Sequence, residues 1–104
     1  MADISAQLEE HLANGEDWEK METPIPGVYV VKIPESKTQK ARLNLELNPL
    51  KDDGRPMKRK GLFVSGKEMF IKFSELFLDE QAFKIIQVME QINGSKAEVK
   101  KLEM

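Results

Sequence analysis

The sequence predicts an α+β fold: an N-terminal helix, a four-stranded antiparallel meander sheet and a long C-terminal helix packed on one face of that sheet. Three observations predict it. Strand-like runs fill the middle of the chain, their connections are too short for crossover helices, and apolar residues recur at helical spacing at both ends. With 104 residues, 40% hydrophobic and 33% charged, the chain has the composition of one small globular domain.

Residues 1–22 are predicted to form an acidic helical head. Asp3 or Ser5 can cap a short helix that runs through Ala13, because both side chains accept hydrogen bonds from helical N–H groups. The pair Asn14–Gly15 tolerates a left-handed backbone and is expected to end this helix. The helix is expected to carry one apolar stripe, formed by Ile4, Leu8 and Leu12.

Residues 27–75 are predicted to form a basic sheet, after a further helical turn over 16–21 and two prolines that exclude helix. The expected strands are 28–33, 41–47, 57–65 and 69–74. The second strand alternates, with Leu43, Leu45 and Leu47 on one face and Arg42, Asn44 and Glu46 on the other. One face of the sheet is therefore expected in the core, and the other is available for function.

The last two expected strands predict an aromatic pair. A hairpin loop at 65–68 would place Phe63 opposite Phe70, with Arg59 and Lys72 on the same face. Bases of single-stranded nucleic acid stack on such rings while cations hold the phosphates. Two alternatives stay open: the two rings can be a second half of the core, buried by the head or by another subunit, and a one-residue shift of the loop would exchange the faces.

A basic stretch needs no strand register to be recognised. Arg55, Lys58, Arg59 and Lys60 lie where a turn-rich segment, 48–56, leads into a strand. By charge the chain is polarised: residues 1–31 hold seven acids and one base, 32–72 hold eleven bases and five acids, and 73–104 hold six acids and four bases. This asymmetry favours an electrostatic partner, although lysine-rich sheet edges can also be solvated protection against edge-to-edge pairing.

The helix expected at 79–94 is unusually apolar. Asp79 is its predicted N-cap, the helix runs from Glu80 to Asn93, and Gly94 ends it. Its apolar residues cover roughly 220° of the helical wheel at ~100° per residue, whereas a surface helix needs a stripe only a little over ~100° wide. We expect it to pack against the sheet and also against either the head or a second subunit. Residues 95–104 form a charged tail.

The sequence offers little for catalysis. It has no Cys and one His, and His11 is expected as a surface or boundary residue of the first helix. Transition-metal sites of the common kinds, phosphate-binding loops and nucleophile motifs are absent from the sequence, so no enzyme, metal or cofactor is predicted. No apolar run approaches the ~20 residues that cross a bilayer, which with the lack of cysteine predicts a cytoplasmic protein with no membrane partner.

The stretch Lys51–Leu62, together with the strand Leu43–Leu47, resembles the β–basic loop–β unit of the single-strand-binding positive cofactor four coactivators. The match covers about twenty residues, and the extra strand and N-terminal helix depart from that family. The order of elements resembles the small archaeal ThermoDBP-related proteins. These resemblances imply a dimer or tetramer whose sheets bind single-stranded DNA or RNA through the basic loop and through Phe63 and Phe70.

The resulting prediction is a non-enzymatic, sequence-tolerant binder of single-stranded nucleic acid that works as a homo-oligomer. DNA and RNA are not distinguished, and neither are dimer and tetramer. The alternative is a protein-interaction module, a small homodimeric α+β adaptor with no nucleic-acid role. The predicted binding residues are Arg42, Arg55, Lys58, Arg59, Lys60, Phe63, Phe70 and Lys72.

Overall fold

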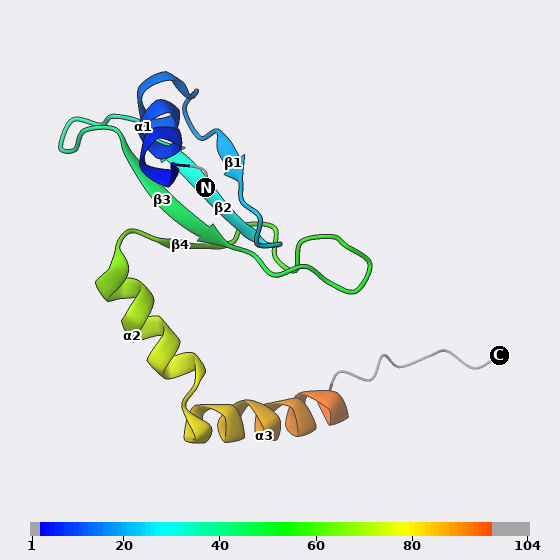
Figure 1. The fold of residues 1–104 in the computed structure, drawn as a ribbon. Helices are drawn as coiled ribbons and strands as arrows, with labels where there is room; N and C mark the ends of the chain where they lie inside the picture. Colours follow the sequence, from blue (N-terminus) through cyan, green and yellow to red (C-terminus); the bar gives the residue numbers. More distant parts are fainter. Residues whose placement is uncertain (1–2, 97–104) are drawn as a thin grey trace. The chain divides into compact units, whose positions relative to one another are not determined.

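The computed structural model describes residues 3–96 and has the α+β architecture expected (Figure 1). Its elements are, in order, α1 (Ile4–Asn14), β1 (Lys20–Glu22), β2 (Val28–Ile33), β3 (Arg42–Leu47), β4 (Leu62–Val64), α2 (Lys67–Phe77) and α3 (Glu80–Lys96). The chain divides into two compact units, which we call unit 1 (Met1–Met69) and unit 2 (Phe70–Met104). Each unit is described by itself.

The sheet is a four-stranded antiparallel meander in the order β1-β2-β3-β4, as predicted, but two of its strands differ from those expected. The segment 16–21 does not form a helical turn: Trp18 has a positive φ of 66°, and the chain continues into β1. A tight turn over 23–27 then pairs β1 with β2, closed by hydrogen bonds from the Thr23 hydroxyl to the carbonyl oxygens of Ile25 and Val28. The third expected strand, 57–65, shortens to β4.

The fourth expected strand, 69–74, is wrong, because these residues form the middle of α2. Apolar residues at 69, 71 and 73 alternate as in a strand, yet those at 69, 70, 73, 76 and 77 also follow helical spacing. The helical pattern continues to Phe77, whereas the alternating pattern stops at Phe73. The longer pattern prevails, since helical backbone satisfies its own hydrogen bonds without a neighbouring strand.

The strand register gives the sheet two chemically different faces. One, which we call the leucine face, carries Met21, Val28, Val30, Lys32, Leu43, Leu45, Leu47, Leu62 and Val64. The other, which we call the aromatic face, carries Lys20, Glu22, Tyr29, Val31, Ile33, Arg42, Asn44, Glu46 and Phe63. The predicted division of the second expected strand between leucines and polar residues is confirmed.

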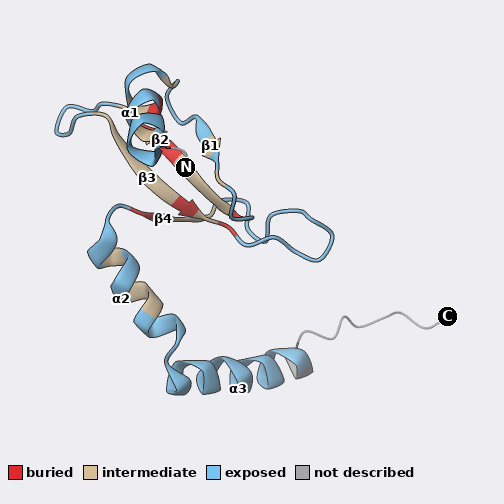
Figure 2. Cartoon of the chain, viewed as in Figure 1, coloured by how far each residue is buried: buried red, intermediate tan, exposed pale blue. Residues whose placement is uncertain are grey.

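Helix α1 lies across the sheet (Figure 1) and is capped by Asp3, whose carboxylate accepts from the Ala6 N–H. The Lys32 ammonium donates to the Gly15 carbonyl at 2.9 Å, which places the end of α1 on the leucine face. The helix ends at Asn14, one residue beyond the predicted Ala13, and Gly15 is extended rather than left-handed. The buried side chains of β2 and β3 lie on the aromatic face, at Val31, Ile33 and Glu46, whereas the leucines of the leucine face are only half-buried (Figure 2). The expectation that the leucines form the buried face and the opposite face is open is therefore wrong in part.

His11 is buried, not at the surface as expected. Its Nε2 lies 3.1 Å from the Glu19 carbonyl oxygen and 3.2 Å from that of Val30. Both neighbours are acceptors, so Nε2 must carry the ring proton and share it between them. The imidazole therefore ties α1 to β2 and to the residue that precedes β1, which makes His11 a structural residue of unit 1.

Unit 2 contains most of α2 and the whole of α3. Asp79 caps α3 as predicted, because its Oδ1 accepts from the N–H groups of Gln81 and Ala82 at 2.9 Å. The helix passes through Gly94 and continues to Lys96, so Gly94 does not end it. The tail expected at 95–104 lies largely outside the described residues. None of the described helices is long and apolar enough to cross a membrane.

Candidate functional site

Two aromatic side chains stand in one cross-strand row of the aromatic face. Tyr29 on β2 is paired with Glu46 on β3, and Glu46 is paired in turn with Phe63 on β4. Both rings are half-buried, so each keeps part of its surface open. With neighbouring strands ~4.8 Å apart, the two rings are separated by roughly 10 Å, which is too far for ring contact but leaves room for separate ligand groups.

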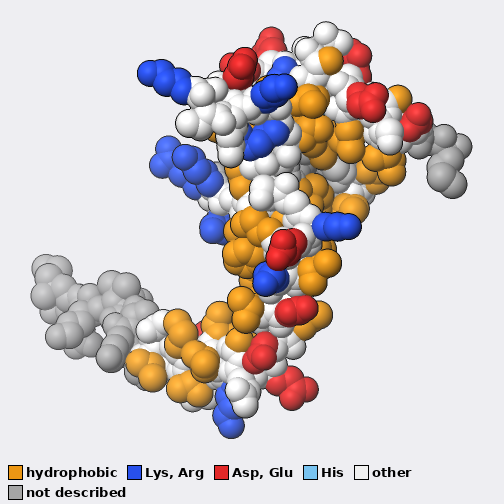
Figure 3. Space-filling model, turned by 90° about the vertical axis from the view of Figure 1, so that its left-hand side faces the viewer, with side chains coloured by type: hydrophobic (Ala, Val, Ile, Leu, Met, Phe, Trp, Pro, Cys, Tyr) orange, Lys and Arg blue, Asp and Glu red, His pale blue; other side chains and the backbone are white. Residues whose placement is uncertain are grey.

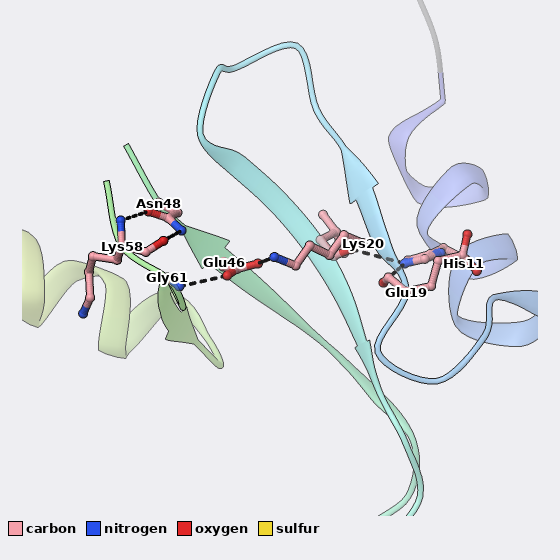
Figure 4. A network of polar contacts seen from close by, with 8 residues as sticks. His11, Glu19, Lys20, Glu46, Asn48, Lys58 and Gly61 are labelled. Atoms are coloured by element: carbon pink, nitrogen blue, oxygen red, sulfur yellow. Dashed lines mark hydrogen bonds and ion pairs between the residues drawn. The ribbon is translucent and has the colours of Figure 1, made fainter. Parts of the chain in front are cut away.

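The carboxylate between the two aromatics is buried and held on both sides. Glu46 is 1% exposed; its Oε1 lies 2.9 Å from the Lys20 ammonium, and its Oε2 accepts from the Gly61 N–H at 2.9 Å (Figure 4). The Lys20 ammonium also sits 5.5 Å from the centre of the Tyr29 ring. The negative charge of Glu46 is therefore compensated within the protein, and the row does not present a free anion to a ligand.

Gly61 is required where it approaches Glu46. A Cβ at this position would lie 2.7 Å from the Glu46 Cγ and 2.7 Å from the Leu47 carbonyl oxygen. Such distances are far below van der Waals contact, so any larger residue would push the basic segment away from β3. The close approach brings residues 58–60 to the edge of the aromatic face.

The connection between β3 and β4 is an ordered hairpin, although the strand pairing between its two arms is limited to one bridge, between Leu50 and Pro56. At its base the Asn48 side chain imitates a strand: its Nδ2 donates to the Lys58 carbonyl at 2.8 Å, and its Oδ1 accepts from the Lys58 N–H at 3.0 Å (Figure 4). At its tip Gly54 adopts a positive φ of 84°. The basic segment is thus fixed to the sheet at Lys58.

The four predicted cations of this hairpin, which also carries Lys51, differ in availability. Arg55 is held by Asp53: its Nε and Nη2 donate to the Asp53 Oδ2 at 3.0 and 2.9 Å, and its backbone N–H donates to Oδ1 at 3.0 Å. These bonds, the backbone one first, lower the pKa of Asp53 below its usual 3.8. Lys58, Arg59 and Lys60 are exposed, and no ion pair ties them to the part of the chain that the structure describes.

The predicted site residues separate into two groups. Arg42 and Phe63 lie on the aromatic face, and Arg55, Lys58, Arg59 and Lys60 lie on the hairpin that leads into β4. Phe70 and Lys72 lie on α2 in unit 2. The hairpin that would have paired Phe70 with Phe63 does not exist, because α2 begins at Lys67; the predicted aromatic pair and its flanking Lys72 are therefore wrong.

Five residues of this site are not among the predicted binding residues: Lys20, Tyr29, Glu46, Asn48 and Gly61. The position of Tyr29 needs the β2–β3 register, which no short loop fixes. The two prolines and Gly27 were a usable signal for β1, because a tight reverse turn before a strand requires a partner strand ahead of it. The burial of Glu46 has no sequence signal, since alternation assigns it to an open face.

Within residues 3–96, no three His, Asp or Glu side chains are grouped so that they could hold a metal ion. No protein-family model, no curated protein and no solved structure matches the chain. The function is therefore inferred from the residues of the chain itself.

Proposed function

We propose that unit 1 binds single-stranded DNA or RNA with little dependence on sequence and without enzymatic activity. The observation that carries the proposal is the row Tyr29–Glu46–Phe63, which places two aromatic rings on one sheet face beside the exposed cations of the hairpin. The proposal also keeps two expectations from the sequence. The protein would be cytoplasmic and homo-oligomeric, and its order of elements resembles that of the archaeal ThermoDBP-related proteins.

Stacking would come from Tyr29 and Phe63. A base would stack on the exposed part of each ring, which at Tyr29 lies beside the Lys20 ammonium, and stacking on an aromatic side chain contributes ~1–3 kcal/mol per base regardless of base identity. The roughly 10 Å between the rings suits two bases of an extended strand better than the stacked bases of a duplex. A single strand is therefore the favoured ligand.

Phosphate contacts would come from Lys58, Arg59, Lys60 and Arg42. The first three follow one another at the edge of the aromatic face, and Arg42 lies on that face at the far end of β3. Neutralising four phosphates of a single strand predicts a slope near −3 in log K against log salt, at ~0.7 per phosphate. Arg55 contributes less than these four, because its guanidinium is already paired with Asp53.

The test is fluorescence anisotropy of a labelled 20-nucleotide single strand, measured at several salt concentrations with a duplex of the same sequence beside it. Tyr29→Ala and Phe63→Ala are expected to weaken binding by roughly 5- to 150-fold, from ~1–3 kcal/mol per lost stack, with the salt slope unchanged. Lys58→Gln, Arg59→Gln and Lys60→Gln together should reduce the slope by about 2.

The matched control for charge is Lys84→Gln on α3, which removes one exposed cation outside unit 1 and should leave slope and affinity unchanged. Circular dichroism of each variant shows whether unit 1 remains folded. Absent or salt-independent binding by the unmodified protein would overturn the proposal. In that case the alternative of a protein-interaction module, in which a protein partner covers the aromatic face, becomes the better account.

A further inference from the structure

Unit 2 exposes an apolar surface that its own two helices cannot cover. Within the described residues of unit 2, eleven large apolar side chains are between 44% and 83% exposed, and none is buried. They include Phe70, Phe77 and Leu78 from α2 and its end, and Phe83, Ile85 and Met89 from α3. Figure 3 shows hydrophobic side chains along these helices. An apolar surface this continuous marks a contact with another molecule or segment.

We infer that α2 and α3 pack against the same two helices of a second copy of this chain, and that the helices of unit 2 are stable only in that assembly. The inference concerns unit 2 and does not depend on nucleic-acid binding by unit 1. It extends the oligomer expected from the sequence in two ways: it adds α2, which was expected as a strand, to the interface, and it makes folding of unit 2 depend on association.

The size of the surface fits a stable dimer. Fully buried aromatic side chains contribute ~150–250 Å² each and the aliphatic ones less, so three phenylalanines and eight aliphatic side chains at about half exposure offer at most on the order of 900 Å² per subunit. A stable specific interface needs about 800 Å² from each partner. The eleven side chains therefore supply enough area without any contribution from unit 1.

The helices also need a partner for their own stability. Helix α2 has 11 residues, and isolated helices shorter than ~12–15 residues are marginal in water; α3 is longer, with 17 residues, but most helical stability in proteins comes from packing of an apolar face. The rings of Phe73 and Phe77 lie with their centroids 6.3 Å apart, but both belong to α2 and their contact does not join the two helices. Two helices with no buried residue between positions 70 and 94 gain little from packing to offset the entropy of ordering them, so a partner surface must.

A second copy suits this surface better than the other surfaces at hand. The end of α1 lies on the leucine face of the sheet, and the aromatic face carries Lys20 and Arg42, whose charged groups an apolar helix would desolvate. A membrane surface is disfavoured as well, because the few charged residues of α2 and α3 are of both signs and lack the basic excess typical of interfacial helices. The same helices of another copy offer an equally apolar counterpart.

The test uses the full chain in sedimentation equilibrium, combined with circular dichroism at 222 nm over a dilution series. The unmodified protein is expected to be a dimer or a higher assembly of even order that loses helical signal as it dissociates. Phe77→Glu and Ile85→Glu each place a charge in the interface and should weaken self-association by at least about 100-fold. Gln87→Glu, on the polar side of α3, is the matched control and should leave the assembly intact.

Two results would overturn the inference. One is a protein that stays monomeric, with full helical signal, at concentrations of about 100 μM. The other is an assembly that both glutamate variants leave unchanged, since the interface would then lie elsewhere. Binding of a short oligonucleotide, measured separately, reports on unit 1, so the failure of one proposal is distinguished from the failure of the other.

Discussion

Glu46 shows how one buried side chain can organise several strands. It belongs to β3, its Oε1 reaches Lys20 on β1, and its Oε2 reaches the Gly61 N–H just before β4. Most of its energetic importance comes from its own burial, because the Lys20 side chain is 51% exposed and its charge is screened by water. Removal of the Glu46 side chain leaves the Gly61 N–H without its acceptor and a cavity between the strands, and both effects are destabilising.

We therefore predict that Glu46→Ala lowers the free energy of unfolding by about 3 kcal/mol, and Glu46→Gln by about 1–2 kcal/mol, because the amide oxygen still accepts from Gly61. Urea denaturation followed by tyrosine and tryptophan fluorescence measures both. Glu22→Gln, on the same face at the exposed edge strand, is the control and should change stability by less than ~0.5 kcal/mol. If Glu46→Ala left the free energy of unfolding unchanged, the contacts of Glu46 with Lys20 and Gly61 would not be what holds the strands together.

Asp53 provides a prediction for pH. Its pKa is lowered in the folded protein by hydrogen bonds from the Arg55 backbone and guanidinium, so the folded state binds this proton less tightly than the unfolded chain does. The contact therefore favours folding above the usual pKa of 3.8, and this contribution is lost as the pH falls through the lower, folded-state pKa.

An NMR titration of the Asp53 side-chain carboxyl should give a midpoint below 3.8. Arg55→Ala should raise the midpoint toward 3.8, whereas Arg59→Ala, which removes a cation of the same hairpin, should not. If Arg55→Ala left the midpoint of Asp53 unchanged, the ion pair between Asp53 and Arg55 would not form in solution.

At the scale of elements, the hairpin between β3 and β4 is ordered by a side chain rather than by a strand ladder. Asn48 exchanges two hydrogen bonds with the Lys58 backbone, as a neighbouring strand would. Because Lys58, Arg59 and Lys60 follow directly, this contact decides whether the basic segment lies beside the aromatic face or moves freely.

Asn48→Ala removes both hydrogen bonds and should destabilise unit 1 by about 2 kcal/mol, at roughly 1 kcal/mol for each. The amide proton of Lys58 should then exchange with solvent much faster, as hydrogen-exchange NMR can measure. Asn48→Asp keeps the acceptor for the Lys58 N–H and should have a smaller effect. Asn14→Ala, which breaks an exposed bond to Glu10, serves as the control, and equal effects of the two alanine variants would contradict the assignment.

The elements also show where sequence patterns were sufficient. Helices α1 and α3 and strands β2 and β3 follow from caps and periodicity, because each has a pattern that only one type of structure fits. Helix α2 does not follow from its pattern, since the apolar residues of 69–74 fit both the strand period and the helix period. The residues that come after them favour the helix. Strand β1 is too short for a pattern of its own and exists because β2 offers it a pairing edge.

At the scale of the molecule, the polarised charge and the apolar helices belong to different parts of the chain. The basic residues 55–60 and the row Tyr29–Glu46–Phe63 lie in unit 1, whereas the exposed apolar surface lies in unit 2. The proposed ligand site and the proposed assembly surface therefore use different residues. A ligand site and an assembly surface can therefore be tested independently.

The sequence alone determined the α+β class, the basic stretch 55–60, the assignment of Arg42 and Phe63 to the polar side of the sheet, and the excess apolar surface of α3. These depend on composition and on periods of 2 and 3.6 residues, which are local properties. Only the tertiary structure decided that Phe70 leaves the sheet, that Tyr29 shares a face with Phe63, and that Glu46 is buried between them. Those facts depend on strand register and on contacts between residues far apart in the chain, which no local pattern encodes.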